Sequence, residues 1–264
     1  MSDEPGNRED KEQDEELAEG TLLSHLIELR SRLIKISIAV IGMFVILLPF
    51  SQKIFVVVSQ PLVDVLPGQK MIATAVASPL LTPFKLTFFV ALFVAMPVVL
   101  YQVWAFVAPG LYRKEKRFAF PLLGSSILLF YAGIAFAYFV VFELVFGFFA
   151  SITPQSVEMM TDIAAYLDFI TKIFLAFGIA FEVPIATVLV VWTGLTTPEK
   201  LGKARPYVFL MAFVVGMFLT PPDIISQTLL AVPVYLLYEL GIMMSRIFSR
   251  ERRRDSDETV AADS

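Results

Sequence analysis

The chain has 264 residues, of which 57% are hydrophobic and only 17% charged, and 25 of them are phenylalanine. A soluble domain has roughly half apolar and a quarter charged residues, so this composition indicates an integral membrane protein. The absence of cysteine excludes disulfides, thiolate metal sites and cysteine nucleophiles, and a single histidine cannot make a histidine-rich metal site, so we expect no cofactor.

The first predicted elements are an acidic tail and an amphipathic helix. Residues 1–20 hold nine acidic and two basic residues, which predicts a disordered cytoplasmic tail. From residue 21 onward, leucines recur at helical spacing beside a polar stripe that contains Glu28 and Arg32. This pattern indicates a helix at the membrane surface. It serves either as a simple anchor or, through the carboxylate of Glu28, as a binding surface.

Six apolar segments follow, each a candidate membrane-spanning helix, since about 20 helical residues cross the hydrocarbon core. They lie within a membrane domain of residues 21–248, and residues 249–264 read as a second disordered tail. The fifth segment rises only about 20 Å as a helix. It is therefore either a shallow hairpin with the sixth segment or a short span in thinned bilayer. The segments are, in chain order, about 32–50, 84–107, 118–148, 164–193, 207–219 and 224–248.

The distribution of basic residues predicts the orientation. Arginine and lysine cluster before the first segment, between the second and third, between the fourth and fifth, and after the sixth. The opposite loops hold only Lys53, Lys70 and Lys85. Because an excess of basic residues marks the cytoplasmic side, both termini are predicted to be cytoplasmic. The longest outside loop, 51–82, contains three prolines and is expected to form short helices and turns.

A few polar groups stand out against this apolar background. Glu182 lies inside the fourth segment, where a carboxylate is costly unless it meets a partner, water or a proton, and Pro184 after it predicts a bend. Glu115 lies among four cations, either as a surface ion pair or as a binding group. Asp223 is placed to cap the sixth segment, and Gln227 one turn later needs a hydrogen-bond partner.

Five motifs carry a resemblance to a known family. They are HLIELRSRL (25–33), YQVWAFVAPGLYRKEKR (101–117), FGIAFEVPIA (177–186), RPY (205–207) and TPPDIISQ (220–227). In this order they resemble the TatC family, the receptor subunits of the twin-arginine protein translocase. The resemblance covers residues 21–248. It implies an all-α, glove-shaped integral membrane protein with six transmembrane helices, the last two short, and both termini cytoplasmic.

The resemblance also implies a function, and one without enzyme activity. It implies a core component of the Sec-independent translocase of the cytoplasmic (inner) membrane, which binds the twin-arginine signal peptides of folded cargo. Export of the cargo then uses the proton-motive force. The implied partners are TatA-type and TatB-type single-span subunits, signal peptides, membrane lipid and further receptor complexes in a multimer, with no nucleic acid.

Matched position by position, the family motifs assign candidate residues to three groups. Signal-peptide binding is assigned to Glu28, Arg30, Phe106 and Glu115. Docking of partner helices inside the membrane is assigned to Glu182, Met217, Thr220 and Gln227. Functionally sensitive positions on the outside face are Pro61, Asp162 and Asp223. Ala75 departs from the family, which usually has an acidic residue there, so we assign that loop no charge-dependent role.

Arginine chemistry explains how such a site would read its ligand. A guanidinium presents a rigid fork of donors that matches a carboxylate, so two adjacent arginines can engage Glu28 and Glu115. A polar side chain of a single-span partner can hydrogen-bond to Glu182 or Gln227, at about 1 kcal/mol per bond.

Two other protein classes remain as alternatives. A proton-coupled small-molecule secondary transporter would also explain Glu182, but no internal repeat is apparent and the cytoplasmic motifs have no transport role. An intramembrane protease would need serine and histidine at depth or paired aspartates, whereas His25 lies at the aqueous edge and no GxGD motif exists.

Overall fold

Helices account for nearly all regular structure in the part of the chain that the computed structural model describes. The backbone is described for residues 6–65, 71–107, 116–154, 160–219 and 224–262, and side chains for 26–60, 71–106, 120–154, 160–219, 224–225 and 227–247. Within these ranges the one strand-like feature is a parallel bridge between Ile72 and Asp162. The predicted all-α class is confirmed.

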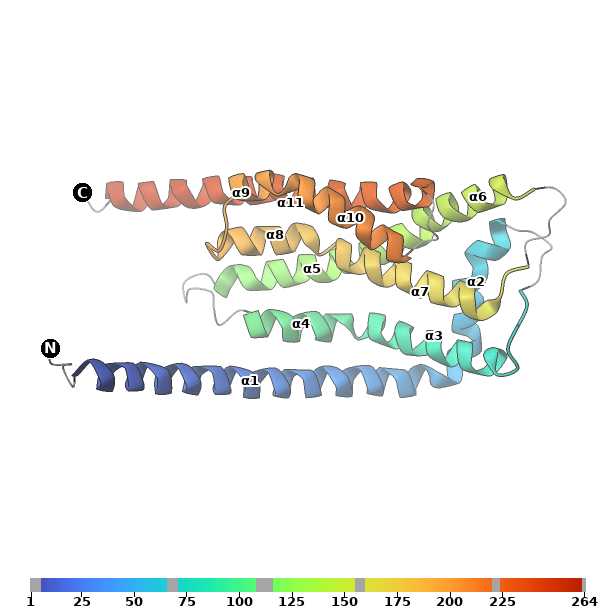
Figure 1. Cartoon of the computed structure of the whole chain (residues 1–264), viewed down its shortest axis with the longest axis horizontal. Helices are drawn as coiled ribbons and strands as arrows, with labels where there is room; N and C mark the ends of the chain where they lie inside the picture. Colours follow the sequence, from blue (N-terminus) through green and yellow to red (C-terminus); the bar gives the residue numbers. More distant parts are fainter. Residues whose placement is uncertain (1–5, 66–70, 108–115, 155–159, 220–223, 263–264) are drawn as a thin grey trace.

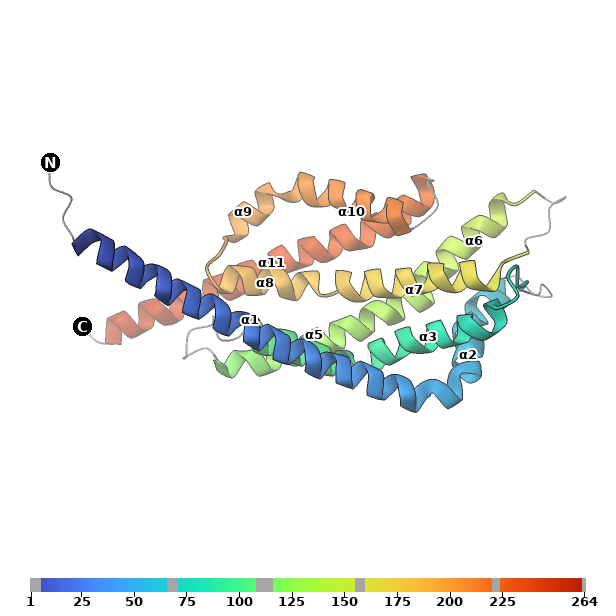
Figure 2. The same ribbon diagram turned by 60° about the horizontal axis from the view of Figure 1, so that its bottom comes forward.

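Most helices run roughly along one long axis, and both termini are at the same end (Figure 1 and Figure 2). Two short turns, η1 (Leu48–Phe50) and the π-helical η4 (Ala137–Val141), join longer helices. The helices are α1 (Gly6–Leu47), α2 (Ser51–Val65), α3 (Ser78–Val94), α4 (Met96–Val107), α5 (Lys116–Phe136), α6 (Phe142–Ile152), α7 (Ile163–Ala180), α8 (Val183–Trp192), α9 (Pro198–Lys203), α10 (Arg205–Leu219) and α11 (Ile224–Ala262).

The two outermost helices extend into the segments predicted to be disordered. α1 begins at Gly6, inside the acidic tail, and α11 continues to Ala262. Both tails are rich in strong helix formers such as glutamate, lysine, arginine and alanine, and extending an existing helix avoids the cost of nucleation. The backbone of residues 6–20 and 249–262 is helical here, and the disorder of the two tails stays a prediction.

Prolines set the places where helices bend. α3 and α4 meet at an angle of 51°. Pro97 has no N–H and so cannot donate to the carbonyl of Phe93 one turn earlier. The hydroxyl of Tyr131, from α5, donates to that carbonyl at 3.0 Å instead. Likewise α7 and α8 are separated by a break just before Pro184, where the sequence predicted a bend.

The core lies between α5, α6 and α7 and is built largely from aromatic side chains. Phe130, Phe142 and Phe177 are almost fully buried there. Two glycines bring the helices close together, since a Cβ at Gly133 would lie 3.0 Å from the backbone carbon of Phe177, and one at Gly178 would lie 2.6 Å from the Phe130 ring. Such close approach is typical of helices packed in membranes.

Several helices are long and apolar enough to cross a membrane. In the described ranges there are four, and the bent pair of α3 and α4 makes a fifth if it counts as one span. α10 is the short apolar helix, with 15 residues that rise about 22 Å. Large apolar side chains along the outer helices, such as Ile38, Phe139 and Phe218, are exposed. These features indicate a multi-pass membrane protein.

Candidate functional site

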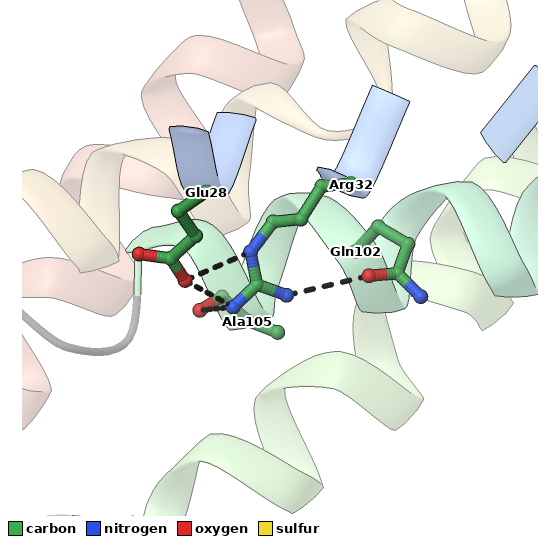
Figure 3. A network of polar contacts seen from close by, with 4 residues as sticks. All are labelled: Glu28, Arg32, Gln102 and Ala105. Carbon is green, nitrogen blue, oxygen red and sulfur yellow. Dashed lines mark hydrogen bonds and ion pairs between the residues drawn. The ribbon is translucent and has the colours of Figure 1, made fainter. Parts of the chain in front are cut away.

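A polar network joins α1 to α4 near the end of the bundle that holds the two termini. Arg32 Nε donates to Glu28 Oε1 at 3.0 Å, and its Nη2 lies 2.5 Å from the same oxygen. Across the helix interface, Nη1 donates to Gln102 Oε1 at 3.3 Å and Nη2 to the carbonyl of Ala105 at 2.8 Å. Figure 3 shows the guanidinium between these three partners. One arginine therefore ties the first helix to the last turns of α4.

The two carboxylate oxygens of Glu28 are used differently. Both contacts from Arg32 go to Oε1, while the other oxygen points away from the guanidinium (Figure 3). No described residue donates to that second oxygen. Arg32 is 18% exposed and Glu28 36% exposed, so the resident pair is partly shielded and still within reach of solvent.

Two of the other predicted signal-binding residues, Phe106 and Arg30, are near this network in the sequence. The third, Glu115, is not among the residues that the structure describes. Phe106 is half-buried and directly follows Ala105 in α4. Arg30 is exposed on α1 and lines a shallow apolar groove with neighbours such as Leu33 and Ile34. The structure therefore brings the segments of Glu28 and Phe106 together through Arg32.

Glu182 occupies the break between α7 and α8 and faces α5. Its Oε2 accepts a short hydrogen bond from the hydroxyl of Ser126, which is fully buried. Its Oε1 is buried and has no hydrogen-bond partner among the described residues. Ser126 is 56 residues away in the sequence. A buried acceptor without a donor is costly.

The second predicted intramembrane group lies where α10 and α11 meet. Gln227 Nε2 donates to the carbonyl of Phe213 at 2.6 Å, which supplies the partner that the sequence required. Gly216 allows this contact, because a Cβ there would lie 3.2 Å from Gln227 Cγ. Met217 is 49% exposed. Thr220, like Asp223, lies outside the described residues.

At the end of the bundle opposite the termini, Asp162 is the N-cap residue directly before α7. Its carboxylate accepts hydrogen bonds from the backbone N–H groups of Ala165 and Thr74, each at 3.1 Å, and from the Thr74 hydroxyl at 2.9 Å. These donors, led by the Ala165 N–H, lower the pKa of the Asp162 carboxyl below its ordinary value. Asp162 thus caps α7 and fastens it to the segment before α3. Pro61 lies in α2, and its side chain is outside the described set.

Sequence reasoning missed several of these partners. It placed Arg32 on the same helical stripe as Glu28, where the four-residue spacing predicts an ion pair, but gave Arg32 no role. Two further ion pairs join helices: Lys85 to Asp168 at 2.6 Å, and Arg205 to Glu239 through two contacts of 2.6 and 2.7 Å. No local sequence signal indicates pairs that are so far apart along the chain.

Comparison with known proteins points to one family. Residues 24–233 match the family model described as "Sec-independent protein translocase protein (TatC)". The TatC protein of Azotobacter chroococcum is 59% identical over 238 residues, covering 89% of this chain and 93% of that protein. The TatC protein of Escherichia coli K12 is 58% identical over 228 residues, covering 86% and 88% respectively.

A solved structure agrees with these sequence matches. A crystal structure of the twin-arginine translocase receptor TatC matches this fold with a TM-score of 0.78 and 37% sequence identity. The match covers 84% of this chain and 98% of the other.

Proposed function

The chain belongs to the TatC family of Sec-independent protein translocase proteins, and from this premise we propose that it binds the twin-arginine signal peptides of folded cargo. It is a multi-pass membrane protein and a core component of that translocase. The proposed role is recognition without catalysis. The alternative of a small-molecule transporter finds no support in the two relatives described above, both of which are named as translocase proteins.

The observation that carries the proposal is the oxygen of Glu28, beside the end of α4, to which no described residue donates. A carboxylate accepts up to about four hydrogen bonds, and Arg32 uses only one of the two oxygens of Glu28. A guanidinium from a bound peptide would find an acceptor there. Phe106, one residue beyond Ala105, would contact apolar parts of the same peptide. Glu115 would supply the second carboxylate for the second arginine.

The proposed function also includes a particular membrane, an orientation in it and partner subunits. We place the protein in the cytoplasmic (inner) membrane with both termini in the cytoplasm, which the basic loops support. TatA-type and TatB-type helices would dock at Glu182, Met217, Thr220 and Gln227. The buried, unpartnered Oε1 of Glu182 supports a polar contact with such a helix. Arg30 would contribute to signal binding, and Pro61, Asp162 and Asp223 would act on the outside face.

Crosslinking tests the signal-peptide site directly. A photoreactive residue at position 106 should crosslink to a twin-arginine peptide, and Glu115→Lys should abolish that crosslink because it adds a cation where an arginine must bind. Glu199→Lys is the matched control, since it reverses an acidic residue near the start of α9 outside the proposed site. A normal crosslinking yield with Glu115→Lys would contradict the assignment, whereas loss in both variants would indicate general damage.

A further inference from the structure

We propose that Arg32 is the positioning residue of the signal-peptide site. Its guanidinium fixes Glu28 through one carboxylate oxygen and leaves the other, which has no donor among the described residues, to an incoming arginine. The inference rests on the proposed function and adds a residue that the family motifs did not assign. It follows from the three-way contact of Arg32 with Glu28, Gln102 and the Ala105 carbonyl.

The first step is the way in which Glu28 is held. An arginine and a carboxylate often pair with two donors on two oxygens, which would leave an incoming guanidinium only one remaining acceptor site on each oxygen. Here Nε and Nη2 both contact Oε1. A second guanidinium can therefore bind the other oxygen while Arg32 stays in place. The carboxylate is shared between a resident and an incoming arginine.

The second step explains why the resident residue is an arginine. The planar fork sends donors in three directions at once: to its own helix at Glu28, and across the interface to Gln102 and Ala105. Gln102 is itself 9% exposed, so the fork is anchored to a buried side chain. A lysine ammonium is a point charge on a flexible stem and does not reproduce this arrangement. Arg32 therefore fixes Glu28 relative to α4, including the turn that carries Phe106.

The third step concerns selectivity. Because Arg32 compensates the charge of Glu28, the pair offers little net attraction to cations in general. Binding then depends on hydrogen-bond geometry at the second oxygen, which a guanidinium fork matches better than an ammonium does. We therefore expect Arg32 to raise the preference of the site for arginine over lysine peptides.

The test measures binding of two peptides, one with consecutive arginines and one with consecutive lysines, to the purified full chain in detergent. Arg32→Ala should weaken binding of the arginine peptide by about tenfold, because a displaced Glu28 loses one charge-assisted hydrogen bond to the peptide. It should also raise the attraction of the site for any cation and so reduce the advantage of the arginine peptide over the lysine peptide. Arg32→Lys, which keeps the charge and is a milder change, should reduce the same advantage. Lys35→Gln removes a cation one turn further along α1 and should change the binding of neither peptide.

A double variant separates positioning from a purely structural role. If Arg32 acts through Glu28, then adding Arg32→Ala to Glu28→Gln should cause little further loss, because the acceptor is already gone. Additive losses would show that Arg32 only holds the helices together and would overturn the inference. Tighter binding by Arg32→Ala would also overturn it, since Arg32 would then be a competitor.

The same measurements distinguish the inference from the function on which it rests. A clear loss with Glu28→Gln and none with either Arg32 variant would overturn the role of Arg32 alone. Unchanged binding by Glu28→Gln would overturn both the proposed site and the positioning role. Thermal unfolding of each variant identifies any that fail to fold. If Arg32→Ala does not fold, the milder Arg32→Lys variant is used in its place.

Discussion

At the scale of single residues, Glu182 has two carboxylate oxygens in different surroundings. Ser126 donates to one of them, and the other is buried with no partner among the described residues. If that oxygen docks a polar group of a single-span partner, Glu182→Gln should keep most cargo export, because an amide still hydrogen-bonds. Glu182→Leu should impair contact with the partner and leave signal-peptide binding largely intact. Cargo export and crosslinking to TatA-type and TatB-type subunits measure the two effects.

Failure of the glutamine variant would reverse this interpretation. If Glu182 transfers protons instead, Gln should be as inactive as Leu while its partner crosslinks stay normal, since neither side chain titrates. Ser126→Ala provides a control, because it removes the internal donor and keeps the carboxylate. We expect it to export cargo nearly normally under the docking hypothesis, since the carboxylate that would bind the partner's polar group is kept.

Asp162 is a residue whose contribution should depend on pH. Its hydrogen bonds lower the pKa of its carboxyl, so the unfolded chain takes up a proton before the folded one does as the pH falls. The stabilisation is therefore complete above the ordinary aspartate pKa of about 3.9 and is lost as the pH falls through the lower folded value. Asp162→Ala should lower the midpoint of thermal unfolding at pH 7 by a few degrees, roughly the effect of losing a helix cap.

Asp162→Asn is the matched comparison, since asparagine also caps helices. At pH 7 its midpoint of thermal unfolding should be closer to that of the unchanged protein than the midpoint of Asp162→Ala is. As the pH falls, it should lack the loss of stability that comes from protonation of Asp162. Melting curves in detergent from pH 7 to pH 3 measure this. Identical curves for Asp162→Ala and the unchanged protein would show that the cap contributes nothing.

At the scale of helices, Gly241 determines how closely α11 approaches α8. A Cβ at this position would lie 3.0 Å from the Cα of Pro184 and would collide with the hydroxyl of Thr187. Because backbone atoms cannot move aside as a side chain can, Gly241→Ala should destabilise the protein by about 1–3 kcal/mol. Thermal unfolding in detergent measures the loss.

Gly42→Ala is the control for this helix contact. Gly42 lies in α1 with no atom within 4 Å of the Cβ position, so alanine there should leave stability unchanged or slightly higher. A Gly241→Ala protein as stable as Gly42→Ala would mean that α8 and α11 do not need this close approach.

Helix positions were largely predictable from sequence, whereas the reasons for their bends were only partly so. Apolar length predicted segments in which the structure has helices, and Pro184 marked the break between α7 and α8 correctly. Pro97 was visible in the second span, but the 51° bend there depends on Tyr131, which donates to the carbonyl that Pro97 leaves free. A tertiary contact of this kind has no local signature in the sequence.

At the scale of the whole molecule, the candidate site also depends on a contact between distant segments that the sequence does not indicate. The family motifs point to Glu28 and Phe106 as single positions, and the four-residue spacing of Glu28 and Arg32 is readable as a helix pair. What joins them is Arg32 bound to Gln102, 70 residues later. Side-chain pairs between helices depend on how the helices pack, and periodicity alone does not determine that packing.

The orientation of the whole bundle can be tested with single cysteines, because the chain contains none. Ser151, at the end of α6 opposite the termini (Figure 1), should react as cysteine with a membrane-impermeant maleimide in intact cells. Ser256, in the C-terminal tail, should react only after permeabilisation. The reverse pattern would invert the proposed orientation.

Ile224→Cys, at the exposed start of α11, tests whether α10 crosses the membrane. With about 22 Å of rise, α10 falls short of a 30 Å core, but the polar residues at its end favour a wet, thinned bilayer. We therefore expect Ile224→Cys to be labelled from outside more slowly than Ser151→Cys. Labelling only after permeabilisation would make α10 and α11 a shallow hairpin on the cytoplasmic side.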